Sequence, residues 1–283
     1  MTVTLGTDPE FFLQTNDGAP VSVCGKIGGT KGDALDIGGG YAIQEDNVMV
    51  EWNIEPQDNP YDFARVTYEG TQRVMDFVRT KMGKDIHPLL SAWVRMPANQ
   101  LVTMQAREFG CSVDYGAYLK GDTLPVMDPE EFDLPEGDAY RFAGGHVHIG
   151  YDNPNEVPEF VVAALADVYL GLYAVGMGEN QGRRRRHYGT AGRYRPTTYG
   201  IEYRTLSNWW LSELEYCETI GNAAFDLGVL IENAPVEQIQ KAYATIPWND
   251  VQNAIANEDR DAANRLRRYC VNVSLGRERG GRL

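Results

Sequence analysis

The segment VMVEWNIEP, residues 48–56, places two carboxylates and an amide on one side of an extended chain. Successive side chains of a β-strand point to opposite faces, so Glu51, Asn53 and Glu55 share one face. The other face carries the apolar residues Val48, Val50, Trp52 and Ile54. Such a strand buries its apolar face and turns its acids either toward solvent or toward a functional cavity.

Three other segments repeat this two-residue spacing. They are GTDPEFF (residues 6–12) with Asp8 and Glu10, GGHVHIG (144–150) with His146 and His148, and YGIEYR (199–204) with Glu202 and Arg204. Apolar residues fill most of the alternate positions, so one sheet could bury one face and gather acids, imidazoles and an arginine on the other. Converging carboxylates repel one another unless they are protonated or bridged by cations. Together the segments predict a divalent-metal site.

Each segment also has a simpler interpretation when it is taken alone. A lone HxH pair is as often a polar strand face as a pair of ligands. A surface ion pair between Glu202 and Arg204 would contribute only about 0 to 1 kcal/mol. Pro9 suits an edge strand or a bulge, so the segment around it is either a functional distortion or an ordinary edge. The order of the four segments, rather than any one of them, supports a site.

Basic residues concentrate in one short stretch of the chain. Six of the 26 lysines and arginines lie between residues 183 and 195, namely Arg183, Arg184, Arg185, Arg186, Arg193 and Arg195. The four adjacent arginines would be stabilised by ATP phosphates or a substrate carboxylate, or they form a solvated basic loop. Arg193 and Arg195 flank Tyr194 near the Glu202 strand, which makes them the better candidates for binding an anion.

The composition narrows the class of protein. A chain of 283 residues with 43% hydrophobic and 23% charged residues is typical of a globular protein. Its formal net charge of -14 disfavours generic binding to nucleic acid or to an anionic membrane. The cysteines form no CxxC pair, which indicates reduced thiols. The N-terminus lacks a signal-peptide pattern, and the most apolar stretch, residues 160–173, is too short to span a bilayer, so we predict a cytoplasmic protein.

Hydrophobic periodicity and turn residues predict both kinds of secondary structure. Strands are expected at residues 3–13, 19–23, 42–55 (as one strand or a bent pair) and 140–151, with another between 182 and 205. Helices are expected at residues 58–82, 158–176, 211–232, 235–246 and 248–270. Residues 84–140 alternate short apolar runs with Pro, Gly and Asp, which suggests strands joined by long loops.

This pattern predicts a single α+β domain over residues 1–275, followed by a frayed tail at residues 276–283. No stretch of the sequence reads as a linker between domains. We expect a curved, mainly antiparallel sheet whose concave face holds the active site and whose convex face carries the helices.

The order GTDPEFF, VEWNIEP, GGHVHIG, an arginine-rich stretch and IEYR resembles the glutamine synthetase superfamily, to which glutamate-cysteine ligases also belong. Within it, the sequence is most similar to the phage-associated amidoligases of the carboxylate-amine ligase type 2 family. The matching stretches lie between residues 5 and 211, whereas residues 84–139 and those after about 212 contribute no match. The resemblance implies a glutamine synthetase-like fold with two or three divalent cations in a nucleotide funnel.

The resemblance also implies roles for individual residues. The implied metal ligands are Asp8, Glu10, Glu51, Glu55, His146 and Glu202. Asp8 stands where glutamine synthetases usually have Glu, so the resemblance implies its direct ligation less strongly than that of Glu10. The implied contacts to the nucleotide are Arg193 and Arg195, with Arg186 as a candidate from the run of four, and His148 is implied as a secondary metal ligand or a phosphate contact. Arg204 would stabilise the transferring phosphoryl group, and Glu51 or Glu55 could deprotonate the incoming amine.

The implied reaction is amide or peptide-like bond formation driven by ATP and Mg²⁺ or Mn²⁺. A small-molecule or peptide carboxylate attacks the γ-phosphate, and an amine then displaces phosphate from the acyl phosphate. A phage origin, also implied by the resemblance, would place the protein in the host cytoplasm. Three alternatives stay open: a guanidine-type or other small-molecule kinase of the same superfamily, a metal-dependent hydrolase, and a non-enzymatic interaction protein on a ligase scaffold.

Overall fold

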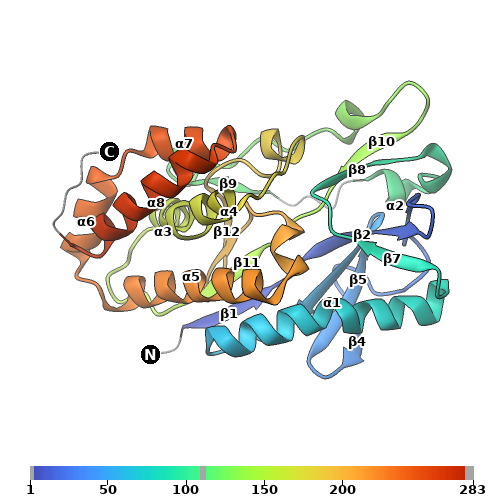
Figure 1. The fold of residues 1–283 in the computed structure, drawn as a ribbon, viewed down its shortest axis with the longest axis horizontal. Helices are drawn as coiled ribbons and strands as arrows, with labels where there is room; N and C mark the ends of the chain where they lie inside the picture. Colours follow the sequence, from blue (N-terminus) through green and yellow to red (C-terminus); the bar gives the residue numbers. More distant parts are fainter. Residues whose placement is uncertain (1–2, 109–112, 278–283) are drawn as a thin grey trace.

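Antiparallel strands form the framework of the protein (Figure 1). The computed structural model describes residues 3–108 and 113–277, and within these ranges the strands form three sheets. The five-stranded sheet has the order β1 (Thr4–Thr7), β11 (Val147–Gly150), β13 (Gly200–Tyr203), β12 (Arg193–Pro196) and β9 (Tyr115–Gly116). The six-stranded sheet has the order β3 (Pro20–Val21), β2 (Glu10–Thr15), β6 (Met49–Ile54), β5 (Tyr41–Asp46) and β4 (Leu35–Gly38), and β7 (Ile86–Leu89) also pairs with β2. Strands β8 (Trp93–Met96) and β10 (Ala139–Phe142) pair separately.

Pro9 marks the junction between the two larger sheets. The strand predicted at residues 3–13 is interrupted there, because β1 ends at Thr7 and β2 begins at Glu10. Proline has no N–H to donate to a ladder. Beyond it, the Glu10 N–H donates to the carbonyl oxygen of Gly144 at 2.9 Å. The single curved sheet expected from the sequence is therefore two sheets that meet at Asp8 and Pro9, while the α+β class with antiparallel strands is confirmed.

Helices cover the apolar side of both sheets. Helix α5 (Leu214–Asn233) packs on β1 and β11, α3 (Glu159–Ala166) packs on β12 and β13, and α1 (Pro60–Met82) packs on β5, β6 and β7. Val147, Ile149 and Ile201 point into this layer and are buried. The alternate residues of the same strands, which include His148 and Glu202, therefore project from the opposite side.

Helix α1 confirms the helix predicted at residues 58–82. Asn59 caps its N-terminus by accepting a hydrogen bond from the Asp62 N–H at 2.8 Å, and Pro60 occupies the first turn. The helix approaches β6 closely at Gly70, where an added Cβ would lie 2.4 Å from the Trp52 ring. Trp52 is fully buried as a result, which orients the strand that carries Glu51.

The most apolar helical stretch lies inside the fold. Residues Glu159–Met177 comprise α3, a π-helical turn (Asp167–Gly171) and α4 (Leu172–Met177). By length and composition this stretch could cross a membrane, but 83% of its most apolar window is buried, as in the core helix of a globular protein. Asp167 accepts hydrogen bonds from Tyr118 and Tyr203, and burial raises the pKa of its carboxyl to about 6. This contact fastens the helix to β13.

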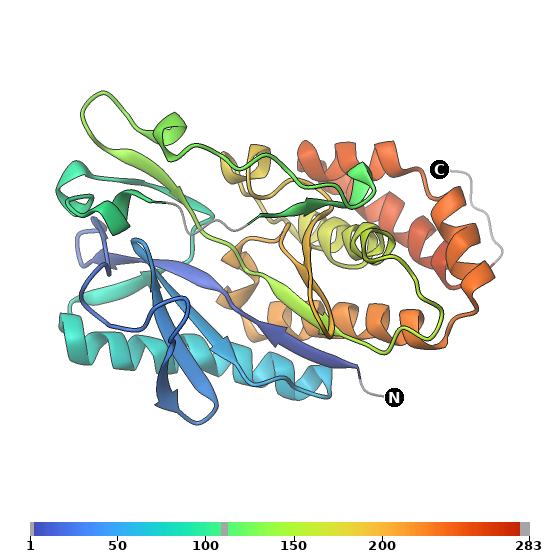
Figure 2. The same ribbon diagram turned by 180° about the vertical axis from the view of Figure 1, so that it is seen from behind.

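The C-terminal helices differ from the prediction in number. Helix α6 (Val236–Thr245) matches the expected segment, but residues 248–270 do not form one helix. They contain α7 (Trp248–Ala256) and the start of α8 (Arg260–Ser274), separated by Glu258 at φ 53° and by Asp259, which caps α8. Figures 1 and 2 show α6, α7 and α8 gathered at one end of the molecule. The single-domain organisation stays a prediction, and residues 278–283 of the predicted tail lie outside the described residues.

Two of the shorter helical elements also carry residues discussed below or a clear cap. Helix α2 (Met104–Arg107) forms a single turn that Thr103 caps. A 3₁₀ turn (Arg184–Arg186) follows α4 and carries the run of arginines toward β12.

Candidate metal and anion site

Strand register brings most of the predicted site residues to the junction between the sheets. In the five-stranded sheet, His148 lies directly opposite Glu202. In the six-stranded sheet, Glu10 lies directly opposite Glu51. Opposed residues of antiparallel strands project to the same face. Because the chain passes from one sheet to the other through Asp8 and Pro9, the two pairs become neighbours.

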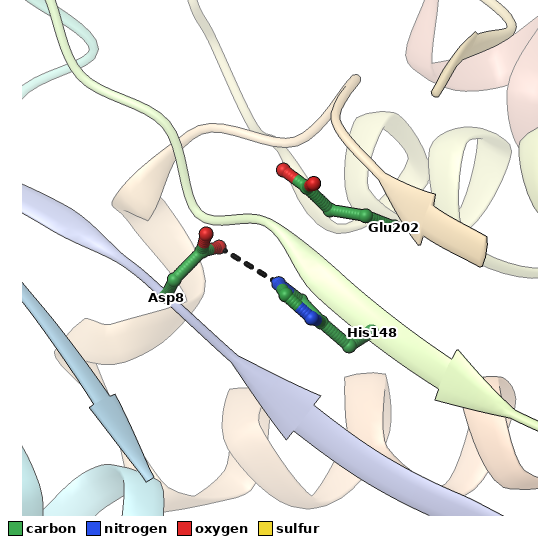
Figure 3. Close-up of side chains that lie close together, drawn as sticks. All are labelled: Asp8, His148 and Glu202. Atoms are coloured by element: carbon green, nitrogen blue, oxygen red, sulfur yellow. Dashed lines mark ion pairs between the residues drawn. The ribbon is translucent and has the colours of Figure 1, made fainter. Parts of the chain in front are cut away.

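Three potential metal ligands, Asp8, His148 and Glu202, form a group that we call the histidine cluster (Figure 3). One ligand atom of each lies within 4.8 Å of the others. Asp8 Oδ1 is 3.1 Å from His148 Nε2, and Figure 3 shows these two side chains pointing toward each other. His146 borders the cluster, with its Nδ1 atom 3.2 Å from Asp8 Oδ1 and 3.4 Å from Glu202 Oε1.

The charges in the histidine cluster are strongly coupled. Burial raises the pKa of Asp8, but the imidazoles of His148 and His146 outweigh that effect and hold it well below its usual range. Burial lowers the pKa of His148, yet the Asp8 carboxylate outweighs burial and raises it overall. Burial, followed by the Arg204 charge, lowers the pKa of His146 to about 4, which leaves that ring neutral at pH 7.

The donor set of the histidine cluster fits a divalent cation. His148 Nε2 is buried and makes no well-formed hydrogen bond, although Asp8 Oδ1 is close to it. On the other side of the ring, Nδ1 lies 2.6 Å from the Tyr199 hydroxyl, which fixes the orientation of the imidazole. Two carboxylates and an imidazole are ligands that Mn²⁺ accepts readily. A cation bound to Nε2 would replace the proton that His148 and Asp8 otherwise share.

A second group, Glu10, Asp46 and Glu51, forms what we call the acidic cluster, again with one oxygen of each within 4.8 Å of the others. Burial, aided by Asp46, raises the pKa of Glu10 to about 7. Burial, followed by the charges of Asp8 and Asp46, raises the pKa of Glu51 well above its usual range. Buried carboxylates this close require protons or a cation between them, and an all-oxygen set suits Mg²⁺.

Three arginine side chains converge beside the histidine cluster on one carboxylate, that of Asp114. The Nε atoms of Arg193 and Arg195 each lie 3.0 Å from an Asp114 oxygen, and Arg204 Nε lies 3.1 Å from it. Arg204 also contacts Glu202 through Nη1. The arginine group, defined as Arg193, Arg195 and Arg204, thus adjoins a ligand of the histidine cluster, because Arg195 and Arg204 both lie close to Glu202.

The structure brings nine of the predicted residues to this junction: Asp8, Glu10, Glu51, His146, His148, Arg193, Arg195, Glu202 and Arg204. It does not bring Glu55 or Arg186 there, because both side chains are exposed. Glu55 lies beyond the end of β6, four residues and so about 13 Å along the chain from Glu51. Arg186 ends a 3₁₀ turn that directs Arg184 and Arg185 inward instead.

The sequence motifs did not point to Asp46 or Asp114, and Arg186 rather than Arg184 was the candidate chosen from the run of four arginines. The sequence signal for Asp46 is the following residue, Asn47, because asparagine favours tight turns. The structure has a hairpin there, with a φ of 56° at Asn47. Counting back from that turn places Asp46 on the same face as Glu51. Asp114 lies in the part of the chain where no clear strand pattern exists, and its position depends on the pairing of β9 with β12.

The two glutamates of the VEWNIEP segment provide a paired test of the acidic cluster. We expect Glu51→Gln to weaken Mn²⁺ binding at least about tenfold, since it removes a charged ligand, and Glu55→Gln to leave the affinity within about twofold. Isothermal titration calorimetry of the folded variants measures both. Equal losses in the two variants would show that the acidic cluster does not hold the cation.

Stability should depend jointly on pH and on divalent cations. The folded-state pKa of Glu10 is about 7 against an ordinary value of 4.5, so its contribution to stability is complete below about pH 4.5 and disappears as pH rises through about 7. A bound cation needs the deprotonated carboxylate and replaces the proton. We therefore expect the rise in Tm caused by saturating Mg²⁺ or Mn²⁺, relative to EDTA, to grow between about pH 5.5 and pH 8. Thermal unfolding across this range measures it, and a cation effect that shrinks with pH would contradict it.

Comparison with known proteins agrees with these motifs. Residues 138–270 match the family described as phage phiEco32-like COOH.NH2 ligase-type 2. The match includes β11 with His148, β13 with Glu202, and Arg204 directly after β13. A comparison with curated proteins finds no match. Among solved structures, the chain resembles a bifunctional glutathione synthetase from Pasteurella multocida at 12% identity and a TM-score of 0.45, covering 98% of this chain and 50% of that one. The match of residues 138–270 to the phage phiEco32-like carboxylate–amine ligase type 2 family therefore agrees with the family that the motifs predicted.

Proposed function

We propose that the protein joins a carboxylate to an amine at the expense of ATP, through an acyl phosphate and with divalent cations. The observation that carries this proposal is the contact between cation ligands and arginines. Arg204 Nη1 contacts Glu202 and lies 3.1 Å from His146 Nδ1, while its Nε atom faces Asp114 beside Arg193 and Arg195. Phosphoryl transfer requires such positioning and charge neutralisation, whereas metal-assisted hydrolysis has no evident need for the arginine group.

The proposed roles follow from the positions of the side chains. Asp8, His148 and Glu202 would hold one cation, and Glu10, Asp46 and Glu51 another. When bound, the cations neutralise the phosphate oxygens and favour attack at the γ-phosphorus. Arg204 lies between the two clusters and the rest of the arginine group, which suits it to stabilise the phosphoryl group during transfer.

In the first step, an oxygen of the substrate carboxylate attacks the γ-phosphorus and ADP leaves. In the second, the amine attacks the acyl carbon, loses a proton, and releases inorganic phosphate. Of the two glutamates with a possible role as base, only Glu51 lies in the acidic cluster. Glu51 can accept the proton only while it is deprotonated and not bound to a cation, so this role requires Glu10 and Asp46 to hold the second cation.

A product screen tests the proposal. The protein is incubated with ATP, Mg²⁺ or Mn²⁺, and pooled amino acids, polyamines and peptides, and products are identified by mass spectrometry. We expect ADP to accumulate only when an acid and an amine are both present, with a new product equal to their sum minus one water. Acid with hydroxylamine should give a hydroxamate. A phosphorylated product formed without an amine would indicate a kinase, and cleavage of an amide without ATP would indicate a hydrolase.

A further inference from the structure

The run of four arginines at residues 183–186 divides into inward and outward side chains. Arg183 and Arg186 are exposed, whereas Arg184 and Arg185 retain only 1% and 3% of their accessible surface. Arg185 has carboxylate partners, with Nη2 2.8 Å from Glu179 Oε2 and Nε 3.4 Å from Glu258 Oε1. Arg185 therefore forms a buried structural ion pair with these glutamates. The burial of Arg184 needs a separate explanation.

Arg184 is held on one side by neutral oxygens. Its Nη1 atom donates to Gln181 Oε1 at 2.5 Å and to the Thr205 carbonyl at 3.1 Å, and Nη2 donates to the Arg204 carbonyl at 3.1 Å. Within residues 3–108 and 113–277, no carboxylate forms an ion pair with it. A fully buried guanidinium whose partners are all uncharged is unfavourable unless an anion compensates its charge.

One edge of this guanidinium stays open. A guanidinium has five N–H donors, and the three carbonyl contacts use three of them. The remaining donors are on Nε and Nη2, and Nε is a buried atom without a hydrogen-bond partner in the described part of the chain. These two atoms lie side by side and are spaced to hold two oxygens of a carboxylate or phosphoryl group.

The cavity next to Arg184 contains the proposed reaction centre. Arg184 lines it together with Glu10, Asp46, His146 and Arg204, and its volume is about 40 Å³. That volume is far below the roughly 300 to 1,000 Å³ of pockets that enclose a whole small molecule, so the cavity admits the tip of a ligand rather than a whole substrate. Gly144 forms one wall, and an added Cβ there would lie 3.1 Å from Arg184 Nη2.

Charge balance indicates what the cavity would bind. In the cation-free protein the carboxylates of the acidic cluster offset Arg184 at longer range. Fully ionised, Glu10, Asp46 and Glu51 carry three negative charges against the two positive charges of Arg184 and Arg204, and one divalent cation changes this net charge from −1 to +1. An oxyanion restores the balance.

We propose that Arg184 is an oxyanion-binding residue, whose open Nε edge holds a phosphoryl or carboxylate group of a substrate beside the acidic cluster. This inference rests on the proposed ligase function for its substrates. It separates the buried Arg184 from its exposed neighbours, one of which, Arg183, stacks on Tyr140 with its guanidinium carbon 4.2 Å from the ring centre.

Arg184→Lys tests the assignment because lysine keeps the charge but loses the two-pronged edge, and Arg183→Lys is the matched control from the same run. Binding of AMP-PNP and of ADP is measured by calorimetry with Mg²⁺, and the KM of the acid by steady-state ligation. We expect Arg184→Lys to weaken one of the two oxyanion interactions about ten- to a hundredfold. Loss of AMP-PNP affinity without loss of ADP affinity assigns the γ-phosphoryl group, and a raised KM for the acid alone assigns the carboxylate. Arg183→Lys should change neither.

Two results would overturn the assignment of Arg184 as an oxyanion-binding residue. Unchanged affinity for AMP-PNP together with an unchanged KM for the acid would overturn the proposal, even if kcat falls, because Arg184 would then act only by supporting the Arg204 backbone. If Arg184→Lys does not fold, a crystal structure of the wild-type protein with Mg²⁺ and tungstate decides. Tungstate oxygen within hydrogen-bonding distance of Arg184 Nε supports the assignment, and tungstate bound only elsewhere refutes it. The nucleotide and tungstate measurements require no turnover, so they separate this inference from the ligase proposal.

Discussion

Glu202→Gln is expected to lower kcat/KM for ligation by about 10²- to 10³-fold while the protein stays folded. The Glu202 side chain is only 8% exposed and contacts Arg204 Nη1, with Arg195 Nη1 3.8 Å away. It also belongs to the histidine cluster. Glutamine has nearly the same shape but no charge, so the substitution removes a cation ligand and leaves a buried guanidinium less well compensated. Both effects act at the place where phosphoryl transfer is proposed.

Steady-state kinetics with ATP, and Mn²⁺ binding followed by electron paramagnetic resonance, measure this effect. Glu215→Gln, on an exposed position of α5, makes the same chemical change away from the site and should leave both quantities unaltered. Circular dichroism checks that the two variants fold alike. If Glu202→Gln kept wild-type activity and Mn²⁺ affinity, the histidine cluster would have no role in the reaction.

Side-chain direction within the strands could be predicted from the sequence because it is a local property of the extended backbone. The alternation of Val147, His148 and Ile149 places the imidazole opposite the buried face, and the structure has that arrangement. Helix α1 could be predicted for a similar reason, since Asn59 and Pro60 form a local start signal. These features need no knowledge of what packs against them.

Other features depend on contacts between distant segments and could not be predicted from the local sequence. The interruption at Pro9 divides the expected sheet because Glu10 finds Gly144 as its partner, more than a hundred residues along the chain. Likewise, Glu51 and Glu55 share a face in the sequence pattern, but only Glu51 lies where the second sheet approaches. Alternation thus predicts which way a side chain points, and tertiary pairing determines which side chains meet.

The contacts of Asp114 depend on tertiary pairing and could not be predicted from strand alternation. Replacing this residue should have the largest effect on stability. Its side chain is 7% exposed and provides the carboxylate shared by Arg193, Arg195 and Arg204. We expect Asp114→Asn to lower the free energy of unfolding by about 3 to 5 kcal/mol, because it removes the carboxylate charge that three largely buried guanidinium groups share. Urea denaturation of the cation-free protein measures the loss.

A control variant and a double variant test whether the loss of stability comes from the arginine charges. Asp122→Asn, at an exposed position of the same region, controls for the chemical change and should shift the free energy of unfolding by less than about 0.5 kcal/mol. Adding Arg195→Gln to Asp114→Asn removes one of the positive charges that Asp114 offset, so the double variant should be more stable than Asp114→Asn alone. Additive losses would instead show that Asp114 stabilises the protein through packing, and that the arginine group is held in place by its other contacts.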